Sequence, residues 1–264
     1  MVLGYHRYFK FFQNVKNPHI YWIDKIFPSN EITFVTKPNK ISIRVPKKLM
    51  LVFKEIFLDD FYNINSLKRE LNNESIIVDI GANVGFFSFL LLSKIDVKKI
   101  YAFEPIPTNA TFFKEIISEN KILQDKILLM SVAVTGIDHE SIDLFLDDTN
   151  ELTENASVFA EYKSTSTIKI SVPSISLSKF FEHYRIAQID FLKLDCEGSE
   201  FDIIYNTAPS LLKRIKKMVV EVHDVEGDPK SNISYFSKHL QSIGFVTHSE
   251  SLNKNLHILI ADRQ

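Results

Sequence analysis

The sequence is poor in cysteine, in glycine and in net charge, and each shortage is informative. A single cysteine, Cys196, rules out an internal disulfide framework and favours a reducing compartment. Glycine accounts for only 7 of 264 residues, so glycines close together at a strand end are unlikely to be idle. A net charge of -2 provides no basic field for capturing nucleic acid, which favours a small or neutral substrate.

The start of the chain lacks a long hydrophobic run. Basic side chains interrupt residues 1–22, so no stretch there has the length of a signal sequence or a membrane span. We therefore expect a cytoplasmic protein without a transmembrane segment. The aromatic residues of this region are expected to pack on the main domain or on a partner subunit, with weak contact to a membrane surface as the alternative. They are Tyr5, Tyr8, Phe9, Phe11 and Phe12.

The length of 264 residues predicts one α/β domain with a smaller appendage rather than two ordinary domains. Residues 32–35 and 41–45 are β-branched runs around a turn, which indicates a hairpin, and residues 49–71 are predicted to be helical. We expect residues 1–72 to form an N-terminal appendage of helix, β-hairpin and helix. Residues 73–264 are expected to form the main domain.

From Ile76 onward, short apolar runs alternate with amphipathic stretches, which is the pattern of βαβ units on a parallel sheet. The runs lack polar alternation, as expected of strands buried on both faces. The predicted strands are 76–80, 99–103, 127–132, 189–195, 218–223, 245–248 and 256–261. The predicted helices are 86–95, 109–120, 177–183, 201–206 and 234–242. Residues 137–167 are polar, and we expect a loop or small hairpin over the site with one strand at 142–146.

The clearest chemical signal is a strand that ends in a glycine-containing turn and opens into a helix, Val78-Asp79-Ile80-Gly81-Ala82-Asn83-Val84-Gly85. Gly81 is expected to let the backbone approach a ligand, and Gly85 to let the helix start pack on the strand. Asn83 replaces the central glycine of dinucleotide-binding loops, so the turn offers fewer bare N–H groups to a pyrophosphate. This favours a ligand without phosphates, and Asp79 is expected to accept from its ammonium group or to orient the turn.

Two further strand ends supply candidate binding residues. Glu104 and Pro105 follow the second predicted strand, where a carboxylate can accept both hydroxyls of a ribose. The alternative is a solvated glutamate that caps the next helix. Ser131 and Ala133 end the third strand, and such small residues leave room for a flat adenine ring, with ordinary core packing as the alternative.

Ionisable residues alternate along the fourth and fifth strands. Asp195, Glu197, Glu221 and His223 are expected to converge at the edge where open α/β sheets bind ligands. Three uses are open: deprotonation of a hydroxyl acceptor by His223 or a carboxylate, a divalent metal site, and a structural ion network. We favour the first and assign no metal, and we expect Asp195 to contact the cofactor as well. Lys193 is expected to be structural, because a buried charge needs a partner such as Asp195 or the aspartate of the turn.

Over residues 76–223 the chain resembles the FkbM-type family of S-adenosylmethionine-dependent methyltransferases. The similarity is carried by these segments in order: VDIGANVGFFS, YAFEPIPTN, SVAV, VPSISLSKFF, FLKLDCEGSEFDII and VVEVH. It implies a Rossmann-like, mostly parallel seven-stranded sheet with an antiparallel last strand and helices on both faces. It further implies a cofactor, S-adenosylmethionine, at residues 79–85 and Glu104.

The usual activity implied by the resemblance is O-methylation, here of a sugar or other hydroxyl-bearing small molecule or glycan. Two alternatives remain. An NAD(P)-dependent oxidoreductase would use the same strand and turn, but Asn83 and the absence of a Tyr-x-x-x-Lys pair disfavour it. A non-catalytic nucleoside-binding module would keep the fold without the chemistry.

Overall fold

The computed structural model describes residues 5–146, 152 and 168–263, and its centre is a seven-stranded sheet in the order β11-β12-β10-β9-β3-β4-β5. The parallel strands are β3 (Ile76–Ile80), β4 (Lys99–Phe103), β5 (Ile127–Met130), β9 (Ile189–Leu194) and β10 (Ile215–His223). Strand β12 (Leu256–Arg263) runs antiparallel to both β10 and β11 (Phe245–Ser251). The predicted Rossmann-like sheet, including its antiparallel strand near the end of the chain, is therefore confirmed.

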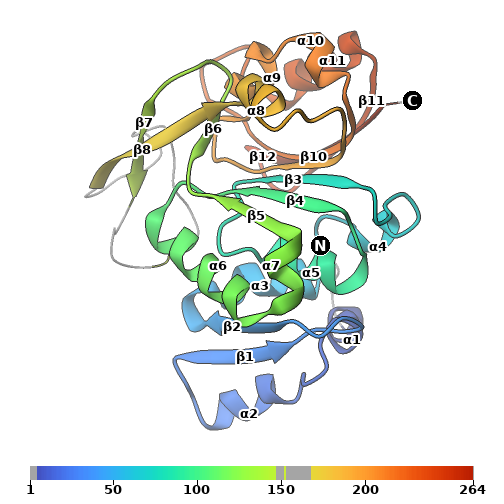
Figure 1. Ribbon diagram of the computed structural model, residues 1–264, viewed down its shortest axis with the longest axis vertical. Coiled ribbons are helices and arrows are strands. Elements are labelled where there is room, and N and C mark those ends of the chain that lie inside the picture. Colours follow the sequence, from blue (N-terminus) through green and yellow to red (C-terminus); the bar gives the residue numbers. More distant parts are fainter. Residues whose placement is uncertain (1–4, 147–151, 153–167, 264) are drawn as a thin grey trace.

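Helices cover both faces of this sheet (Figure 1). On one side are α5 (Phe86–Lys94), α6 (Pro107–Glu119) and α7 (Lys121–Lys126), and on the other are α8 (Leu177–His183), α9 (Glu200–Asn206), α10 (Pro209–Leu212) and α11 (Ile233–Ile243). Successive strand residues belong to opposite cores: Ile77 and Phe191 to the first, and Val78 and Leu192 to the second. Both faces are thus buried, which explains why the strand segments lack polar alternation.

The N-terminal segment adds a further layer below the first set of helices (Figure 1). It consists of α1 (Tyr5–Asn14), α2 (Ile20–Ile26), the antiparallel hairpin β1 (Glu31–Val35) and β2 (Ser42–Pro46), a 3-10 turn (Lys47–Leu49) and α3 (Met50–Phe57). Phe53 stacks on Phe34 at 4.9 Å and meets Phe86 of α5 edge-on at 5.5 Å between ring centroids. The core therefore runs without interruption across the expected boundary at residue 72, and that boundary stays a prediction.

The aromatic residues of α1 divide into buried and exposed side chains. Phe11 is buried and meets Phe34 at 5.4 Å between centroids, whereas Phe9 and Phe12 are exposed. Phe12 stacks on Trp22 of α2 at 5.7 Å. Among the residues described, no helix combines the length and apolar character needed to cross a membrane.

The helix predicted over residues 49–71 is wrong in its middle. Helix α3 ends at Phe57 and α4 (Ile64–Leu67) begins seven positions later, with Asp60 (φ 54°) and Asn63 (φ 51°) in the left-handed region between them. Asp and Asn adopt this conformation more readily than other side chains. The Asp60 carboxylate accepts from the backbone N–H of Ile64 at 2.7 Å and so caps the new helix. The chain consequently turns at residues 58–63, which we call the 58–63 loop.

A small three-stranded sheet, ordered β6-β8-β7, lies beside the main one. Strand β7 (Ser141–Leu146) confirms the strand expected at 142–146, while β6 (Ala133–Thr135) and β8 (Ile168–Ser176) were not predicted. The third main strand ends at Met130 instead of continuing to residue 132, because residues 133–135 pair in parallel with β8. Residues 147–151 and 153–167 of the expected loop lie outside the described residues.

Candidate active site

A cavity of about 690 Å³ opens at the carboxyl edge of the main sheet. Its walls come from the ends of β3, β4, β9 and β10, from β6 and β7, from the β11–β12 turn, and from the 58–63 loop of the N-terminal segment. This volume is typical of pockets that enclose a small organic molecule. The carboxyl edge is also where open α/β sheets bind their ligands.

The two glycines of the turn after β3 lie close to other parts of the protein itself. A Cβ atom at Gly81 (φ 73°) would lie 1.6 Å from the carbonyl oxygen of Asp195, and one at Gly85 (φ 89°) would lie 2.3 Å from the Phe113 ring. Gly81 thus admits the backbone directly after β9, and its expected approach to a ligand stays a prediction. Gly85 admits a side chain of α6 rather than the strand that was expected. Gly81 and Asn83 line the pocket, whereas Gly85 does not.

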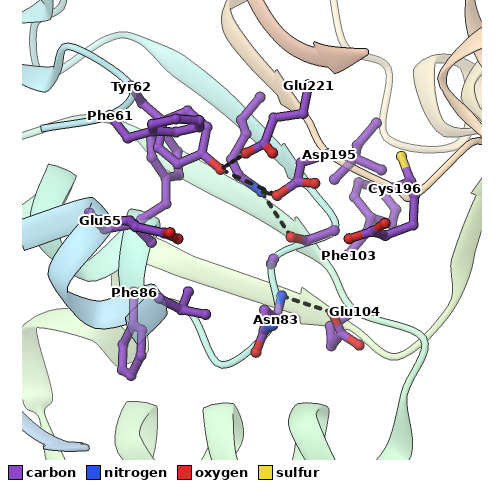
Figure 2. A pocket seen from close by; sticks show the side chains of 18 of the residues that line it. Glu55, Phe61, Tyr62, Asn83, Phe86, Phe103, Glu104, Asp195, Cys196 and Glu221 are labelled. Carbon is purple, nitrogen blue, oxygen red and sulfur yellow. Dashed lines mark hydrogen bonds and ion pairs between the residues drawn. The ribbon is translucent and has the colours of Figure 1, made fainter. Parts of the chain in front are cut away.

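Glu104 is buried at the end of β4 and lines the pocket. Its carboxylate accepts from the backbone N–H of Asn83 at 2.8 Å and of Ile106 at 2.9 Å, as Figure 2 shows for Asn83. Burial raises its pKa to about 7, since these two donors only partly offset the lost hydration. A carboxylate has about four acceptor positions, so Glu104 can still accept from the hydroxyls of a ligand.

The other predicted cofactor residues divide between the pocket and its surroundings. Pro105 and Ala133 line the cavity. Ser131 is exposed and lies outside the lining, because the chain leaves the main sheet after Met130. Asp79 is fully buried behind the turn, where its carboxylate accepts from the Ser88 hydroxyl at 2.7 Å. These contacts agree with a role in orienting the turn, which is one of the two uses expected for Asp79 and stays a prediction.

Lys193, on β9, connects this strand to the turn after β3. Its ammonium nitrogen lies 3.4 Å from the Asp79 carboxylate and 3.3 Å from that of Asp195, and it donates to the carbonyl oxygen of Gly81 at 2.9 Å. Burial opposes its charge, yet the Asp195 and Asp79 carboxylates raise the pKa of Lys193 above its ordinary value. The expected structural pairing is confirmed, and it involves both aspartates rather than one.

Tyr62, which the sequence did not indicate as a site residue, links Asp195 and Glu221 at the pocket wall. The Tyr62 hydroxyl donates to Glu221 Oε1 at 2.7 Å and to Asp195 Oδ2 at 3.2 Å. Figure 2 shows Tyr62 pointing at the two carboxylates, with Glu104 and Asn83 in another part of the pocket. Burial and the adjacent Asp195 charge raise the pKa of Glu221 to about 8. Asp59-Asp60 and Asn63, which favour turns, were the available hint that this segment is not helical.

His223 belongs to a second group of side chains near the same edge. Its Nδ1 lies 3.0 Å from Glu200 Oε1 and its Nε2 lies 3.5 Å from Glu197 Oε2. Burial lowers its pKa, but the Glu200 and Glu197 carboxylates outweigh burial and raise the pKa of His223 to about 10. His223 is therefore a cation at neutral pH. Of the two candidates for the base that deprotonates the acceptor, His223 and a carboxylate, the carboxylate is the better one.

Glu197 reaches this group by a different route from the one expected. Strand β9 ends at Leu194 and Glu197 has φ 50°, so the side-chain alternation of the strand does not continue to it. Asp195, Glu197 and His223 nevertheless bring ligand atoms within 4.8 Å of one another. That spacing suits a cation, but carboxylates already lie beside both nitrogens of the imidazole, which is the arrangement of an ion network. Glu200, which completes the network, occurred in the FLKLDCEGSEFDII segment without an assigned role.

Comparison with known proteins decides the family. The model of the methyltransferase FkbM domain matches residues 79–249, which is more than half of the chain. The chain belongs to the FkbM methyltransferase family. It is 26% identical over 203 residues to methyltransferase sdnD of Sordaria araneosa, covering 67% of this chain and 75% of that protein. It is 25% identical over 211 residues to 31-O-demethyl-FK506 methyltransferase FkbM of Streptomyces tacrolimicus, covering 67% and 75%.

A solved structure of methyltransferase FkbM from Methylobacillus flagellatus matches with a TM-score of 0.49 and 11% identity, covering 81% of this chain and 54% of that one. Membership of the FkbM family makes the protein an S-adenosylmethionine-dependent methyltransferase and sets aside the oxidoreductase and the non-catalytic module. The pocket fits the cofactor in two respects. Its volume suits a nucleoside-sized molecule, and the buried Glu104 carboxylate has acceptor positions to spare.

Proposed function

We propose that this FkbM-family enzyme methylates a hydroxyl oxygen of a sugar or another small molecule or glycan. The observation that carries the proposal is the pair of carboxylates, Asp195 and Glu221, at the wall of the pocket that also contains Glu104. A hydroxyl acceptor needs a group that takes its proton, and Glu221 has a pKa of about 8, near the pH at which such a base works best. The relative named 31-O-demethyl-FK506 methyltransferase supports an oxygen acceptor.

In this proposal the cofactor lies between the turn after β3 and the end of β4. Glu104 accepts from the ribose hydroxyls, and the backbone of Gly81 to Asn83 borders the amino-acid portion. Pro105 and Ala133, which both line the cavity, border the adenine ring. Asp79 and Gly85 act behind the turn, by orienting it and by letting α5 begin there.

When bound, S-adenosylmethionine supplies an electrophilic methyl group on a sulfonium centre. The protein then has to hold the acceptor oxygen in line with that methyl group and to exclude water. Tyr62 occupies Oε1 of Glu221, which leaves Oε2 to receive the proton of the acceptor hydroxyl. Asp195, which pairs with Lys193, orients the acceptor or the cofactor in this proposal. Glu197 and His223 support this edge of the pocket as an ion pair.

The test is methyl transfer from labelled S-adenosylmethionine to fractionated cell glycans and small-molecule extracts. We expect label in a product whose methyl group resists base, as an ether does and a methyl ester does not. Glu221→Gln should lower turnover with cofactor affinity retained, and Glu104→Ala should abolish cofactor binding. Glu70→Gln, which alters a surface partner of Lys217, is the matched control and should behave as the parent. Label found only on nitrogen or in a base-labile ester would contradict the hydroxyl acceptor.

A further inference from the structure

Tyr62 lies outside residues 79–249, the part of the chain that the family model matches. It is nevertheless buried at the pocket wall, and its hydroxyl contacts two carboxylates inside that part: Asp195, directly after β9, and Glu221 on β10. The N-terminal segment therefore contributes a polar group to the wall of the pocket. In Figure 2 the Tyr62 side chain lies beside Phe61 and points at Glu221 and Asp195.

The 58–63 loop holds Tyr62 in place by local means. Asp60 and Asn63, on either side of the Phe61-Tyr62 pair, adopt positive φ, and such residues persist only where the surroundings stabilise them. The Asp60 carboxylate supplies that stabilisation, because it accepts from the Ile64 N–H and from the Asn65 amide, both at 2.7 Å. The loop thus has a defined shape whose result is the placement of one side chain.

The ring of Tyr62 is also fixed by its neighbours. It meets Phe87 at 5.1 Å and Phe61 at 5.1 Å between centroids, both edge-on. The ammonium group of Lys193, which also pairs with Asp195, lies 5.4 Å from the centroid of the Tyr62 ring. A phenol held this tightly loses little freedom when it forms hydrogen bonds, so its hydroxyl can set the position of a flexible carboxylate.

We propose that Tyr62 is a positioning residue of the active site, whose hydroxyl bridges Glu221 and Asp195 and fixes the carboxylate that receives the proton of the acceptor. The inference rests on the proposed function, because it assigns Glu221 that role. Two carboxylates side by side repel each other, and a shared donor offsets the repulsion. Without the hydroxyl, Glu221 Oε1 would lose its donor and the carboxylate would be free to turn away from the pocket.

The charges around Glu221 determine what the loss of this donor should do. Asp195 and Lys193 face it from β9, His223 follows on its own strand, and the paired position on β12 is the apolar Ile258. Asp195 and burial favour the protonated acid, whereas Lys193, His223 and the Tyr62 hydroxyl favour the carboxylate. Removing the hydroxyl should therefore raise the pKa of Glu221.

The experiment is a carbon-13 NMR titration of the full chain with carboxyl-labelled glutamate. The Glu221 signal is assigned by its absence in Glu221→Gln. In Tyr62→Phe we expect the Glu221 titration to move upward by about one pH unit or more, as expected for a lost hydrogen bond to a charged group. Tyr205→Phe is the matched control, because that hydroxyl also donates a hydrogen bond, at 2.8 Å to the Lys230 carbonyl, outside the pocket. An unshifted signal in Tyr62→Phe, or an equal shift in both variants, would overturn the role of Tyr62.

A second measurement covers the case in which Tyr62→Phe does not fold. Placing 3-fluorotyrosine at position 62 keeps the ring and hydroxyl but makes the phenol a stronger donor, so the Glu221 titration should move downward. No movement would overturn the proposal. The methyl-transfer assay of the unaltered protein separates this inference from the proposed function. Label only on nitrogen or in a base-labile ester contradicts the function, whereas a base-stable ether product together with an unshifted Glu221 titration contradicts only the positioning role.

Discussion

The α-carbon of Gly81 faces the carbonyl oxygen of Asp195 so closely that a Cβ atom at position 81 would lie 1.6 Å from it. The turn after β3 and the residue that directly follows β9 are therefore in backbone contact. Gly81→Ala should force β3 and β9 apart, lower the free energy of unfolding and abolish binding of S-adenosylhomocysteine. Calorimetry and urea denaturation measure the two effects.

Gly227→Ala is the matched control for this substitution. Gly227 also has positive φ, at 87°, but a Cβ atom there would meet nothing within 4 Å. It should cost only the backbone strain of about 1–2 kcal/mol and leave binding unchanged. Equal losses in the two variants would mean that strain, and not the contact with Asp195, determines the phenotype.

Glu104 should make cofactor affinity depend on pH. Its pKa of about 7 is raised by burial, so the carboxyl group is largely protonated below that pH in the absence of ligand. Ribose hydroxyls donate to the ionised form, so binding should lower this pKa and release a proton below pH 7. We expect calorimetry with S-adenosylhomocysteine to show tighter binding at pH 8 than at pH 6, and Glu104→Gln to bind more weakly with that difference reduced. A parent affinity that does not change between these pH values would argue against Glu104 as a ligand of the ribose.

Lys193 should be essential for stability. It is buried between Asp79 and Asp195, so Lys193→Met would leave carboxylates without their counter-charge, at a cost of about 3–5 kcal/mol in the free energy of unfolding. Lys98→Met is the control, because the Lys98–Glu74 pair is exposed and such pairs contribute about 0–1 kcal/mol. Urea denaturation of both variants measures the difference. A loss in Lys193→Met no larger than in the control would contradict the structural role.

His223 should stabilise the fold as a cation. Its pKa is raised from 6.5 to about 10, so its contribution is fully present below pH 6.5 and is lost as the pH rises through 10. The urea midpoint of the parent should fall across this window. His223→Asn should have a lower midpoint at pH 7 and a smaller fall toward pH 10, and Glu200→Gln should have the same effect. If the parent and the His223→Asn curves were parallel, the ion pair with Glu200 would not contribute.

Much of the fold could be predicted because its signals are local. Strands buried on both faces appear as continuous apolar runs, and the turn after β3 stands out in a chain with few glycines. Glu104 could be assigned to the pocket because it directly follows a strand whose carboxyl end must lie at the binding edge.

The remaining features depend on contacts between distant segments. Tyr62 stands 133 residues before Asp195 and 159 before Glu221, and no local pattern connects them. The sequence predicts a helix over residues 49–71, and the local Asp60–Ile64 contact interrupts it without indicating which distant side chains Tyr62 meets. Strand β6 was missed for a similar reason, since its partner β8 lies some forty residues further along the chain.

The most direct test of the account is a crystal structure of the protein with S-adenosylhomocysteine. We expect both ribose hydroxyls within hydrogen-bonding distance of the Glu104 carboxylate, and the sulfur atom facing the part of the pocket formed by Asp195 and Glu221. A nucleoside bound away from Glu104, or with its sulfur turned from the two carboxylates, would contradict it.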